Sequence, residues 1–374
     1  MSKLRTGLFL KCAAAAVFLL GLVNTSVGDE PQSATSTAPP AHSPSTQPVL
    51  DARLRPPFHW VSTGPLLSAK ADPQRQVVSI KDPSIVRYND RWHIYATYAT
   101  HTGRWGMLYT SFADWKDAAT APQYFMDDNP NLRGYHCAPQ VFYFAPQQLW
   151  YLVYQSQHPT YSTTTDVSKP ESWSAPRSFF DGTPRSVVQG WLDYWVICDD
   201  THAYLFFTDD HGRFYRSRTA LADFPNGFDE PVVVMHEPVA RELFEGGATY
   251  RIKGTNLCLT LIEAANPQWK RYYKAFIADR LDGSWRPLAA EWGNSFADAT
   301  RVRTQDGSRL WTEDISHGEL LRDGYDQTMT IDPDNLVLLY QGLSPNRPAG
   351  LTYVQLPWQL GLLRLESNAK QTRR

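Results

Sequence analysis

The sequence predicts an all-β fold, a five-bladed β-propeller, and three observations lead to this prediction. Apolar runs of five to seven residues, rich in Val, Ile, Tyr, Phe and Trp, alternate with turn clusters, and no helical periodicity persists. The runs pair into hairpins that open at residues 82, 138, 193, 245 and 327, so successive openings are 56, 55, 52 and 82 residues apart. All intervals but the last are typical of a four-stranded blade. A β-sandwich would also show alternating strands, but it gives no reason for this period.

Each unit begins with an apolar or aromatic strand, turns at a polar or proline-containing cluster and returns as a second strand. We expect these hairpins at residues 82–98, 138–155, 193–208, 245–262 and 327–342. In the first four units a third strand follows, carries a short polar ladder and ends near a Trp or Phe. These closing segments are YTSFADW, STTTDVSKPESW, YRSRTALADF and IADRLDGSW.

The first 50 residues are expected to lie outside the propeller. Three basic residues precede the apolar stretch CAAAAVFLLGLV, and small residues follow at the cleavage-determining positions, so residues 1–28 are predicted to be a signal peptide. The apolar stretch falls short of the roughly 20 residues that span a bilayer, so no membrane attachment is expected after cleavage. Residues 29–50 are rich in Pro, Ser and Thr and are predicted to be a linker, and residues 51–374 form the propeller domain. The protein is therefore expected to be secreted, to the periplasm or the extracellular space.

Composition is that of a globular domain with a sizeable core, since 42% of the 374 residues are hydrophobic and 13% are aromatic. The net charge is −2 and the two signs are interspersed, so no basic stripe could hold a nucleic-acid backbone. Three cysteines follow the signal peptide, which leaves at most one disulfide. Cys198 and Cys258 lie in apolar runs, where a buried free thiol is favoured over a Cys198–Cys258 bridge.

Three acidic residues open hairpins of the repeat, and they are the candidate catalytic residues. Asp82, Asp193 and Glu245 each stand directly before a buried strand. The inner strands of a propeller line its central channel, so these carboxyl groups should meet at the channel mouth. A lone acid at a turn is more often a surface cap, but three in one register favour a site. Two carboxyl groups suffice for hydrolysis of a glycoside, and a third can tune the acid.

Aromatic side chains outside the predicted blade cores are candidates for sugar binding, because the apolar face of a sugar packs on a ring. Trp105 and Tyr353 are the strongest of these candidates, although packing between blades is the commoner role of such residues. His317 precedes the predicted fifth inner strand. It could equally be a hydrogen-bonded structural histidine or a ligand to a metal or substrate.

Seven motifs in order make the sequence similar to glycoside hydrolase family 62 over about residues 56–366. They are KDPSIV with YATYA, GMLYTSFADW, CAPQVFYFAP, DYWVICDD, LFEGGATY, TEDISHGELLRDGYDQ and QLPWQLGLL. The resemblance implies a five-bladed propeller that acts as an α-L-arabinofuranosidase and removes single arabinofuranosyl branches from arabinoxylan with inversion. It also implies a monomer that acts on plant cell-wall arabinoxylan and its oligosaccharides.

Carried over by motif, Asp82 resembles the family's general base, Glu245 its general acid and Asp193 the residue that tunes the acid. Lys81 matches a neighbour that contacts the arabinose, and Tyr353 matches the tyrosine that borders the sugar subsite.

The resemblance also implies a bound metal ion, and the sequence departs from the family at one position. His317 resembles a histidine that helps to hold a calcium ion in the central channel, with Gln327 as a second contact. Val354 follows Tyr353 where the family often has Asn, which puts one polar substrate contact in doubt.

Two alternative functions stay open at this point. One is a family 43-like β-xylosidase or arabinanase, which shares the fold and the three carboxyl groups. The other is a carbohydrate-binding propeller without activity, which the presence of all three acids disfavours. The preference for O-2 or O-3 linkages depends on surface loops and does not follow from these motifs.

Overall fold

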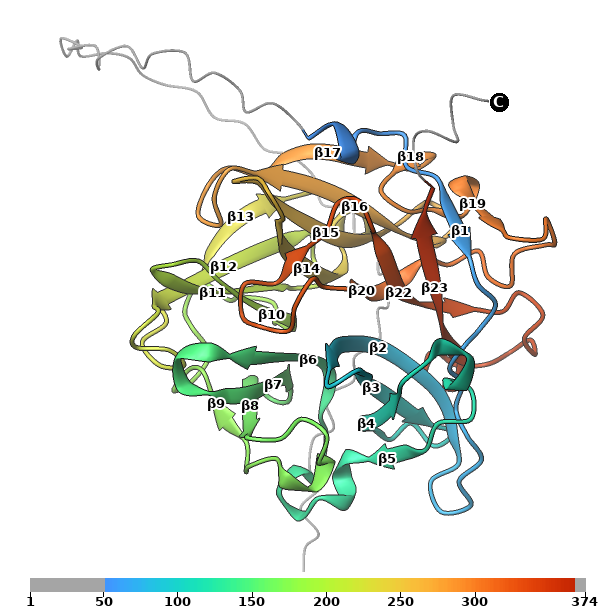
Figure 1. Cartoon of the computed structure of the whole chain (residues 1–374), viewed down its shortest axis with the longest axis horizontal. Helices are drawn as coiled ribbons and strands as arrows, with labels where there is room; N and C mark the ends of the chain where they lie inside the picture. Colours follow the sequence, from blue (N-terminus) through green and yellow to red (C-terminus); the bar gives the residue numbers. More distant parts are fainter. Residues whose placement is uncertain (1–50, 367–374) are drawn as a thin grey trace, which may run out of the picture. The chain divides into compact units, whose positions relative to one another are not determined.

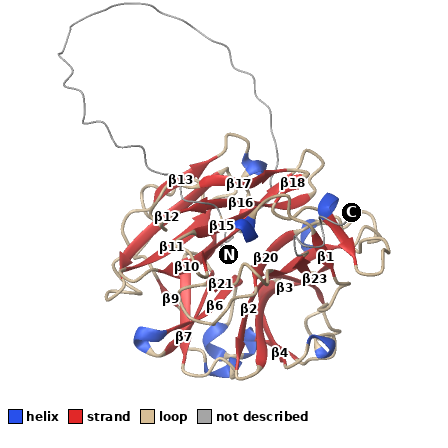
Figure 2. Ribbon diagram, turned by 45° about the horizontal axis from the view of Figure 1, so that its top comes forward, coloured by secondary structure: helices blue, strands red, loops and turns tan. Residues whose placement is uncertain are grey.

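The computed structural model describes residues 51–366, which form five sheets arranged in a ring around a central axis (Figure 1). Strands and loops make up nearly all of this range, and its helices are single 3-10 turns (Figure 2). None of these helices is long and apolar enough to cross a membrane. The predicted all-β, five-bladed propeller is therefore confirmed. The predicted signal peptide and linker, residues 1–28 and 29–50, lie outside the described residues.

Blades 1 to 3 each contain four strands that follow one another from the axis outward. Blade 1 consists of β2 (Val77–Tyr88), β3 (Arg91–Thr100), β4 (Trp105–Phe112) and β5 (Gln123–Phe125). Blade 2 consists of β6 (Cys137–Phe144), β7 (Leu149–Gln155), β8 (Pro159–Thr164) and β9 (Arg177–Ser178). Blade 3 consists of β10 (Leu192–Cys198), β11 (His202–Thr208), β12 (Arg213–Ala220) and β13 (Val232–His236). The third strands β4, β8 and β12 coincide with the polar ladders expected from the sequence.

Blade 4 is the largest sheet, and blade 5 joins the two ends of the described chain. Blade 4 consists of β14 (Glu245–Ile252), β15 (Cys258–Ala265), β16 (Arg271–Ala278), β17 (Arg286–Glu291), β18 (Asn294–Ser295) and β21 (Thr330–Ile331). Blade 5 consists of β20 (Ser316–Leu320), β22 (Val337–Leu343), β23 (Trp358–Leu365), β1 (Trp60–Ser62) and β19 (Val302–Thr304). Within it β1 pairs antiparallel with β23, so an N-terminal strand completes the last blade.

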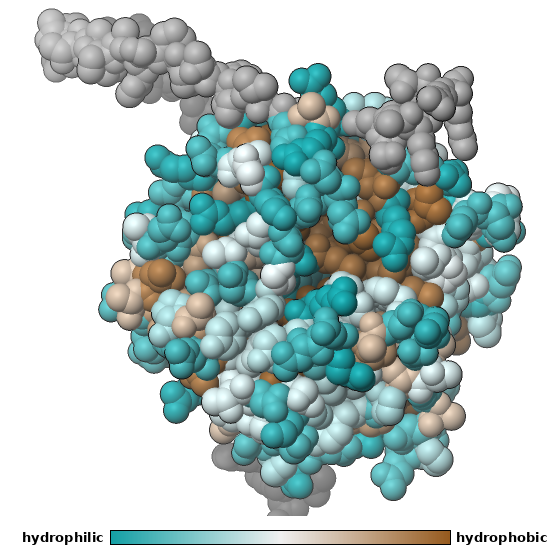
Figure 3. Space-filling model, in the orientation of Figure 1, coloured by the Kyte–Doolittle hydropathy of each residue, from teal (hydrophilic) through white to brown (hydrophobic). Residues whose placement is uncertain are grey.

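The 3-10 helices occupy loops between strands. They are η1 (Ala52–Leu54), η2 (Trp115–Asp117), η3 (Met126–Asp128), η4 (Pro130–Leu132), η5 (Ala145–Gln147), η6 (Pro170–Ser172), η7 (Ala240–Glu242), η8 (Ala299–Arg301) and η9 (Tyr353–Gln355). The face seen in Figure 3 is hydrophilic over most of its rim, and apolar side chains gather around β16, β22 and β23.

The fifth inner strand differs from the prediction. We expected it to open at Gln327, but β20 lines the axis, and β21 pairs parallel with β14 of blade 4. The reason is compositional: TMTI resembles a strand and precedes a good turn, whereas the true inner strand, SHGEL, contains only one large apolar residue, Leu320. A side chain at Gly318 would approach the carbonyl oxygen of Leu339 to 2.1 Å, so close pairing with β22 requires glycine there.

Every inner strand has a register shift near its start, and this irregularity turns side chains toward the channel. In the first four blades a residue with positive φ lies at this point: Asp82 (48°), Ala138 (48°), Asp193 (56°) and Gly246 (62°). Glu245 therefore stands one position earlier than the other two acids, in register with Lys81. The predicted common register is correct for Asp82 and Asp193 and one residue off for Glu245.

Polar side chains tie the inner strands together around the axis. The Gln140 amide exchanges two hydrogen bonds of 2.7 Å with the backbone of Val196 in blade 3. Ser84 donates to Glu319 at 2.6 Å, and Glu319 forms a fully buried ion pair of 2.7 Å with Arg322. The Arg322 guanidinium also donates to backbone carbonyls of blades 1 and 2, both at 2.8 Å. Removal of either member would leave an uncompensated buried charge, which typically costs about 3–5 kcal/mol.

The cysteines behave as the sequence suggests. Cys137, Cys198 and Cys258 are buried free thiols, so residues 51–366 contain no disulfide. The expectation that Cys198 and Cys258 act as small buried hydrophobes is confirmed, because both lie in the core around blades 3 and 4.

Candidate active site

The three candidate acids meet at the mouth of the central channel, the end where the inner strands begin. His317 links two of them, because its Nδ1 lies 3.5 Å from Asp82 Oδ1 and 3.7 Å from Asp193 Oδ2. The third acid adjoins them through the backbone, since the N–H of Gly246 donates to Asp193 Oδ2 at 2.8 Å. Carboxyl groups of blades 1, 3 and 4 thus converge on a histidine of blade 5.

Glycine is required at position 246 for two reasons. Its φ of 62° lies in the left-handed region, which side chains rarely adopt. A Cβ would also lie 3.3 Å from Glu263 Oε2 and 3.4 Å from the His317 ring. The absence of a side chain lets this backbone N–H reach Asp193 and places Glu245 directly beside the channel.

Asp82 is buried and held from two sides. Its backbone N–H donates to Gln341 Oε1 at 2.7 Å, and Lys81 Nζ lies 3.5 Å from its Oδ1. Burial alone would lower the pKa of Lys81, but the charges of Asp82 and Glu245 and the hydroxyl of Tyr353 raise it well above its usual value. Lys81 therefore stays a cation beside Asp82.

Two aromatic rings surround the Lys81 ammonium group. It lies 4.5 Å from the centre of the Trp105 ring and donates to the Tyr353 hydroxyl at 3.0 Å. The two rings are 6.1 Å apart, and Tyr353 is 45% exposed. The structure thus brings three predicted substrate-binding residues together next to Asp82, with an aromatic surface available to a sugar.

Glu245 forms an ion pair with a different cation, Arg271. Arg271 Nη1 donates to Glu245 Oε1 at 2.8 Å and to Glu263 Oε1 at 2.7 Å. The guanidinium carbon of Arg271 lies 4.4 Å from the centre of the Phe244 ring. One cation is therefore shared between two carboxyl groups.

Glu263 is fully buried and supports the site from below. It accepts hydrogen bonds from the Ser316 hydroxyl at 2.9 Å and from the backbone N–H of His317 at 2.7 Å. Burial raises the pKa of Glu263 to about 7, although the Arg271 cation opposes this shift.

The cluster holds more carboxyl groups than cations. Burial raises the pKa of Asp193 to about 6, with His317 opposing and the other acids adding to the shift. Burial also raises the pKa of Asp210 to about 8, and its Oδ1 is buried without a hydrogen-bond partner. The pKa of His317 is raised, because the surrounding carboxylates outweigh its burial. Such a cluster retains protons near neutral pH, as general acid catalysis requires.

The predicted metal contacts are not brought together. The Gln327 side chain accepts from Ala145 N at 3.0 Å, and its carbonyl accepts from Cys198 N at 2.8 Å. Both partners lie where β6 and β10 end, whereas His317 lies where the inner strands begin. Gln327 therefore cannot share an ion with His317.

A calcium ion fits the residues around His317 poorly. Calcium takes six to eight oxygen ligands, but the cavity next to His317 is lined mainly by Pro, Ala and Gly, with Asp193 as its only carboxylate, and has a volume of about 10 Å³. Over residues 51–366 no group of three or more His, Cys, Asp or Glu residues has metal-binding geometry. Calcium binding stays a prediction, without a fitting set of ligands in the described part of the chain.

Arg271, Glu263 and Asp210 belong to the site but were missed from the sequence. Glu263 lies inside the apolar run LCLTLIEAA, and a charged residue in such a run is a usable signal. Arg271 and Asp210 stand beside turns, where charged residues are common. Arg271 and Glu263 approach Glu245 because β14, β15 and β16 are neighbours in the sheet of blade 4.

A larger cavity of about 570 Å³ lies away from these acids. Its lining includes Arg87 and Trp92 at the β2–β3 turn and Val337 at the start of β22. This end of the blades is opposite to the channel mouth, and none of the candidate site residues lines the cavity. The chemistry therefore places the active site at the mouth.

Comparison with known proteins identifies the relatives of this chain. Alpha-L-arabinofuranosidase C of Cellvibrio japonicus (strain Ueda107) is 45% identical over 294 residues, which are 77% of this chain and 44% of that protein. The chain thus spans less than half the length of this curated relative.

Two solved structures are also similar. The catalytic domain of a GH62 alpha-L-arabinofuranosidase from Coprinopsis cinerea has 47% identity and a TM-score of 0.79, with 82% of this chain and 97% of that one covered. A GH62 hydrolase in complex with xylotriose has 40% identity and a TM-score of 0.78, with 82% and 97% covered. The family described as glycosyl hydrolase family 62 matches residues 59–364. With most of its length matched and its acids gathered at the channel mouth, the chain belongs to glycosyl hydrolase family 62.

Proposed function

We propose that this protein is an inverting α-L-arabinofuranosidase that removes single arabinofuranosyl branches from arabinoxylan. The observation that carries the proposal is the convergence of Asp82, Asp193 and Glu245 around His317, with separate cations beside Asp82 and Glu245. Two similar proteins are named as α-L-arabinofuranosidases, and a third was crystallised with xylotriose. These names support both the sugar released and the kind of chain that carries it.

Inversion needs one carboxylate to activate water and one carboxylic acid to protonate the leaving oxygen. Asp82 takes the first role, because a buried carboxylate next to Lys81 is suited to accept a proton from water. Glu245 takes the second role, because it lies where carboxyl groups outnumber cations. Water attacks the anomeric carbon as its proton passes to Asp82, and the bond to the xylan oxygen breaks as that oxygen takes the Glu245 proton.

Asp193 acts as a positioning residue. By accepting the N–H of Gly246, it fixes the backbone next to Glu245 and so the direction of the acid side chain. Its charge, when present, adds to the negative field that keeps a proton in the cluster. Lys81, Trp105 and Tyr353 border the place where the arabinosyl ring would bind, and Val354 offers it no polar group.

One digestion distinguishes this proposal from its rivals. The enzyme should release arabinose from arabinoxylan and leave linear arabinan chains intact. Xylose from arabinoxylan would indicate a β-xylosidase, and oligomers from linear arabinan an endo-arabinanase. Retention on the polysaccharide without any released sugar would indicate a binding protein, and each of these three results contradicts the proposal.

Proton NMR of the first product tests inversion. The anomer formed initially should be opposite to that of the substrate, because a single displacement by water inverts the carbon. A product that retains the configuration would rule out the direct mechanism.

We also propose that the protein is exported and acts as a monomer. The N-terminal signal pattern supports export, and N-terminal sequencing of the protein recovered outside the producing cell should begin after residue 28. Light scattering should give the mass of a single chain, whereas twice that mass would contradict the monomer.

A further inference from the structure

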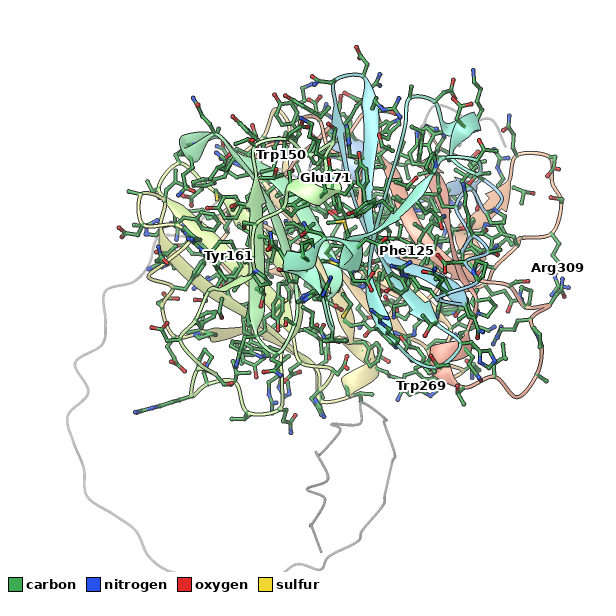
Figure 4. The ribbon with its side chains drawn as sticks, turned by 90° about the horizontal axis from the view of Figure 1, so that it is seen from below. Phe125, Trp150, Tyr161, Glu171, Trp269 and Arg309 are labelled. Carbon is green, nitrogen blue, oxygen red and sulfur yellow. The ribbon has the colours of Figure 1, made fainter. Side chains whose placement is uncertain are left out.

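Trp269 is an exposed aromatic side chain that the proposed mechanism does not use. It lies in the loop between β15 and β16, two residues before Arg271, and is 55% exposed. Figure 4 places it at the outer edge of the molecule. Most tryptophans of this chain lie at least partly buried, so packing does not explain an indole presented to solvent.

The loop holds Trp269 in a fixed and unusual conformation. Its φ is 59°, which for a residue with a side chain costs roughly 1–2 kcal/mol. Buried Asn266 maintains the turn, because its Oδ1 accepts from the backbone N–H groups of Gln268 and Lys270, both at 2.9 Å. The Trp269 N–H donates to the Asn266 carbonyl at 2.8 Å. The indole therefore projects from an ordered backbone.

A chain of contacts leads from Trp269 to the proposed acid. Its ring meets Phe244 edge-on, with centres 6.0 Å apart and an interplanar angle of 77°. The Phe244 ring also contacts the Arg271 guanidinium at 4.4 Å, and Arg271 donates to Glu245 at 2.8 Å. Trp269 thus stands on the Glu245 side of the mouth, whereas Lys81, Trp105 and Tyr353 are grouped beside Asp82.

The chemistry of the acid defines what lies on this side. A general acid must reach the oxygen that leaves, and in arabinoxylan this oxygen belongs to a xylosyl unit of the main chain. The xylan chain must therefore pass next to Glu245. A flat, exposed and rigid indole offers the apolar surface on which a pyranose ring packs.

We propose that Trp269 is a specificity residue that binds a main-chain xylosyl unit on the leaving-group side of Glu245. This inference rests on the proposed function. It assigns the arabinosyl ring to the Asp82 side and the xylan chain to the Glu245 side. Trp269 then contributes to the recognition of arabinose attached to xylan, and not to the recognition of arabinose itself.

The test compares a substrate that has the xylan chain with one that lacks it. Trp269→Ala should lower kcat/KM about tenfold on an arabinosylated xylotriose, mainly through KM, as expected for loss of one aromatic contact. On methyl α-L-arabinofuranoside, whose leaving group is only methanol, kcat/KM should stay within about twofold. Trp269→Phe should restore most of the loss, because it keeps an aromatic face.

Lys270→Ala is the matched control, since it alters the same exposed loop without removing the ring, and it should behave as wild type on both substrates. Equal activity of wild type and Trp269→Ala on the xylotriose substrate would overturn the inference. An equal loss on both substrates would also overturn it, because it would mean that Trp269 only supports the acid. If wild type released no arabinose from either substrate, the proposed function itself would fail, which separates the two outcomes.

Discussion

The Asp82 side and the Glu245 side of the mouth contain the same kinds of groups but differ in the number of carboxyl groups per cation. In each, a cation lies over an aromatic ring and pairs with the proposed catalytic carboxyl group. Lys81 forms an ion pair with Asp82 at 3.5 Å, and it donates a hydrogen bond to the Tyr353 hydroxyl. Arg271 instead divides one nitrogen between Glu245 and Glu263.

This difference in charge distinguishes the proposed acid, Glu245, from the proposed base, Asp82. On the Asp82 side one cation, Lys81, faces one carboxyl group. Two carboxyl groups per cation leave the Glu245 side with an excess of carboxyl groups, and burial together with the neighbouring acids raises the pKa of Asp210 to about 8. An excess of this kind favours retention of a proton. Both hydrogen bonds come from a single guanidinium nitrogen, Nη1 of Arg271.

The largest expected effect separates the two carboxyl groups by their leaving-group dependence. Asp82→Asn and Glu245→Gln should each lower kcat on arabinoxylan by about 10²–10⁴-fold, as is usual for loss of a general base or acid. With 4-nitrophenyl α-L-arabinofuranoside, whose leaving group departs without a proton, Glu245→Gln should recover most activity and Asp82→Asn none. Equal losses of activity by the two variants on the aryl substrate would contradict the assignment of Glu245 as the acid and Asp82 as the base. Circular dichroism should confirm that both variants are folded.

A second experiment removes each cation in turn. Arg271→Met should lower the free energy of unfolding by about 3–5 kcal/mol, because it leaves the fully buried Glu263 and the partly buried Glu245 without their cation. Lys81→Met should destabilise less, since only Asp82 loses its partner and His317 remains 3.5 Å away. Urea unfolding at pH 7 measures both free energies of unfolding. Arg271→Lys serves as the control, because it keeps the positive charge without the guanidinium group. Equal destabilisation by the two Met variants would contradict the difference in charge balance.

The pH dependence of stability should reveal the excess charge directly. The pKa of Glu263 is raised from 4.5 to about 7, so the fold favours its protonated form. Its contribution to stability is fully present below about pH 4.5 and is lost as pH rises through 7. This one group should lower the free energy of unfolding by on the order of 3 kcal/mol over that window. Urea unfolding at pH 4.5 and pH 8 should show a flatter dependence for Glu263→Gln, and an unchanged slope would contradict the burial argument.

The smallest expected effect concerns the aromatic ring beside Lys81. Trp105→Ala removes a cation–π contact of about 0.5–2 kcal/mol and part of the proposed arabinosyl surface. Activity should fall several-fold on arabinosylated xylotriose and on methyl α-L-arabinofuranoside alike, as measured by kcat/KM. A loss confined to the xylotriose substrate would place the xylan chain on this side and undo the distinction from Trp269.

The sequence predicted most of the fold because blades 1 to 4 bury hairpins with strong apolar patterns. It located Asp82 and Asp193 for the same reason, since each acid interrupts such a pattern where an inner strand begins. The inner strand of blade 5 was not predicted, because it lacks an apolar pattern. Its His317 lies at the channel mouth and its Glu319 pairs with Arg322 near the axis, so polar residues stand where the other inner strands have apolar ones. Gln327 was misplaced as a consequence.

The remaining site residues depend on contacts that no single segment reveals. Arg271 reaches Glu245 only because β14, β15 and β16 are neighbours in one sheet, and Glu263 reaches His317 only because blades 4 and 5 adjoin. Among these residues only Glu263 could be recognised from the local sequence, because it is a charged residue within an apolar run. Spacing along the chain cannot report the sharing of one cation by two acids.

The pairing of β1 with β23 has a consequence for how the molecule is assembled. Residues 60–62 leave the ribosome roughly 300 residues before their partners at 363–365, so blade 5 cannot be completed during most of synthesis. His317, which joins the acids of blades 1 and 3, belongs to that last blade. The complete active site should therefore form only at the end of synthesis. In a nascent chain that ends before β23, blade 5 is incomplete, so His317 should not yet be positioned between the carboxyl groups of blades 1 and 3. The two ends of the described range lie side by side through the pairing of β1 with β23, which makes the domain a candidate for circular permutation at this junction.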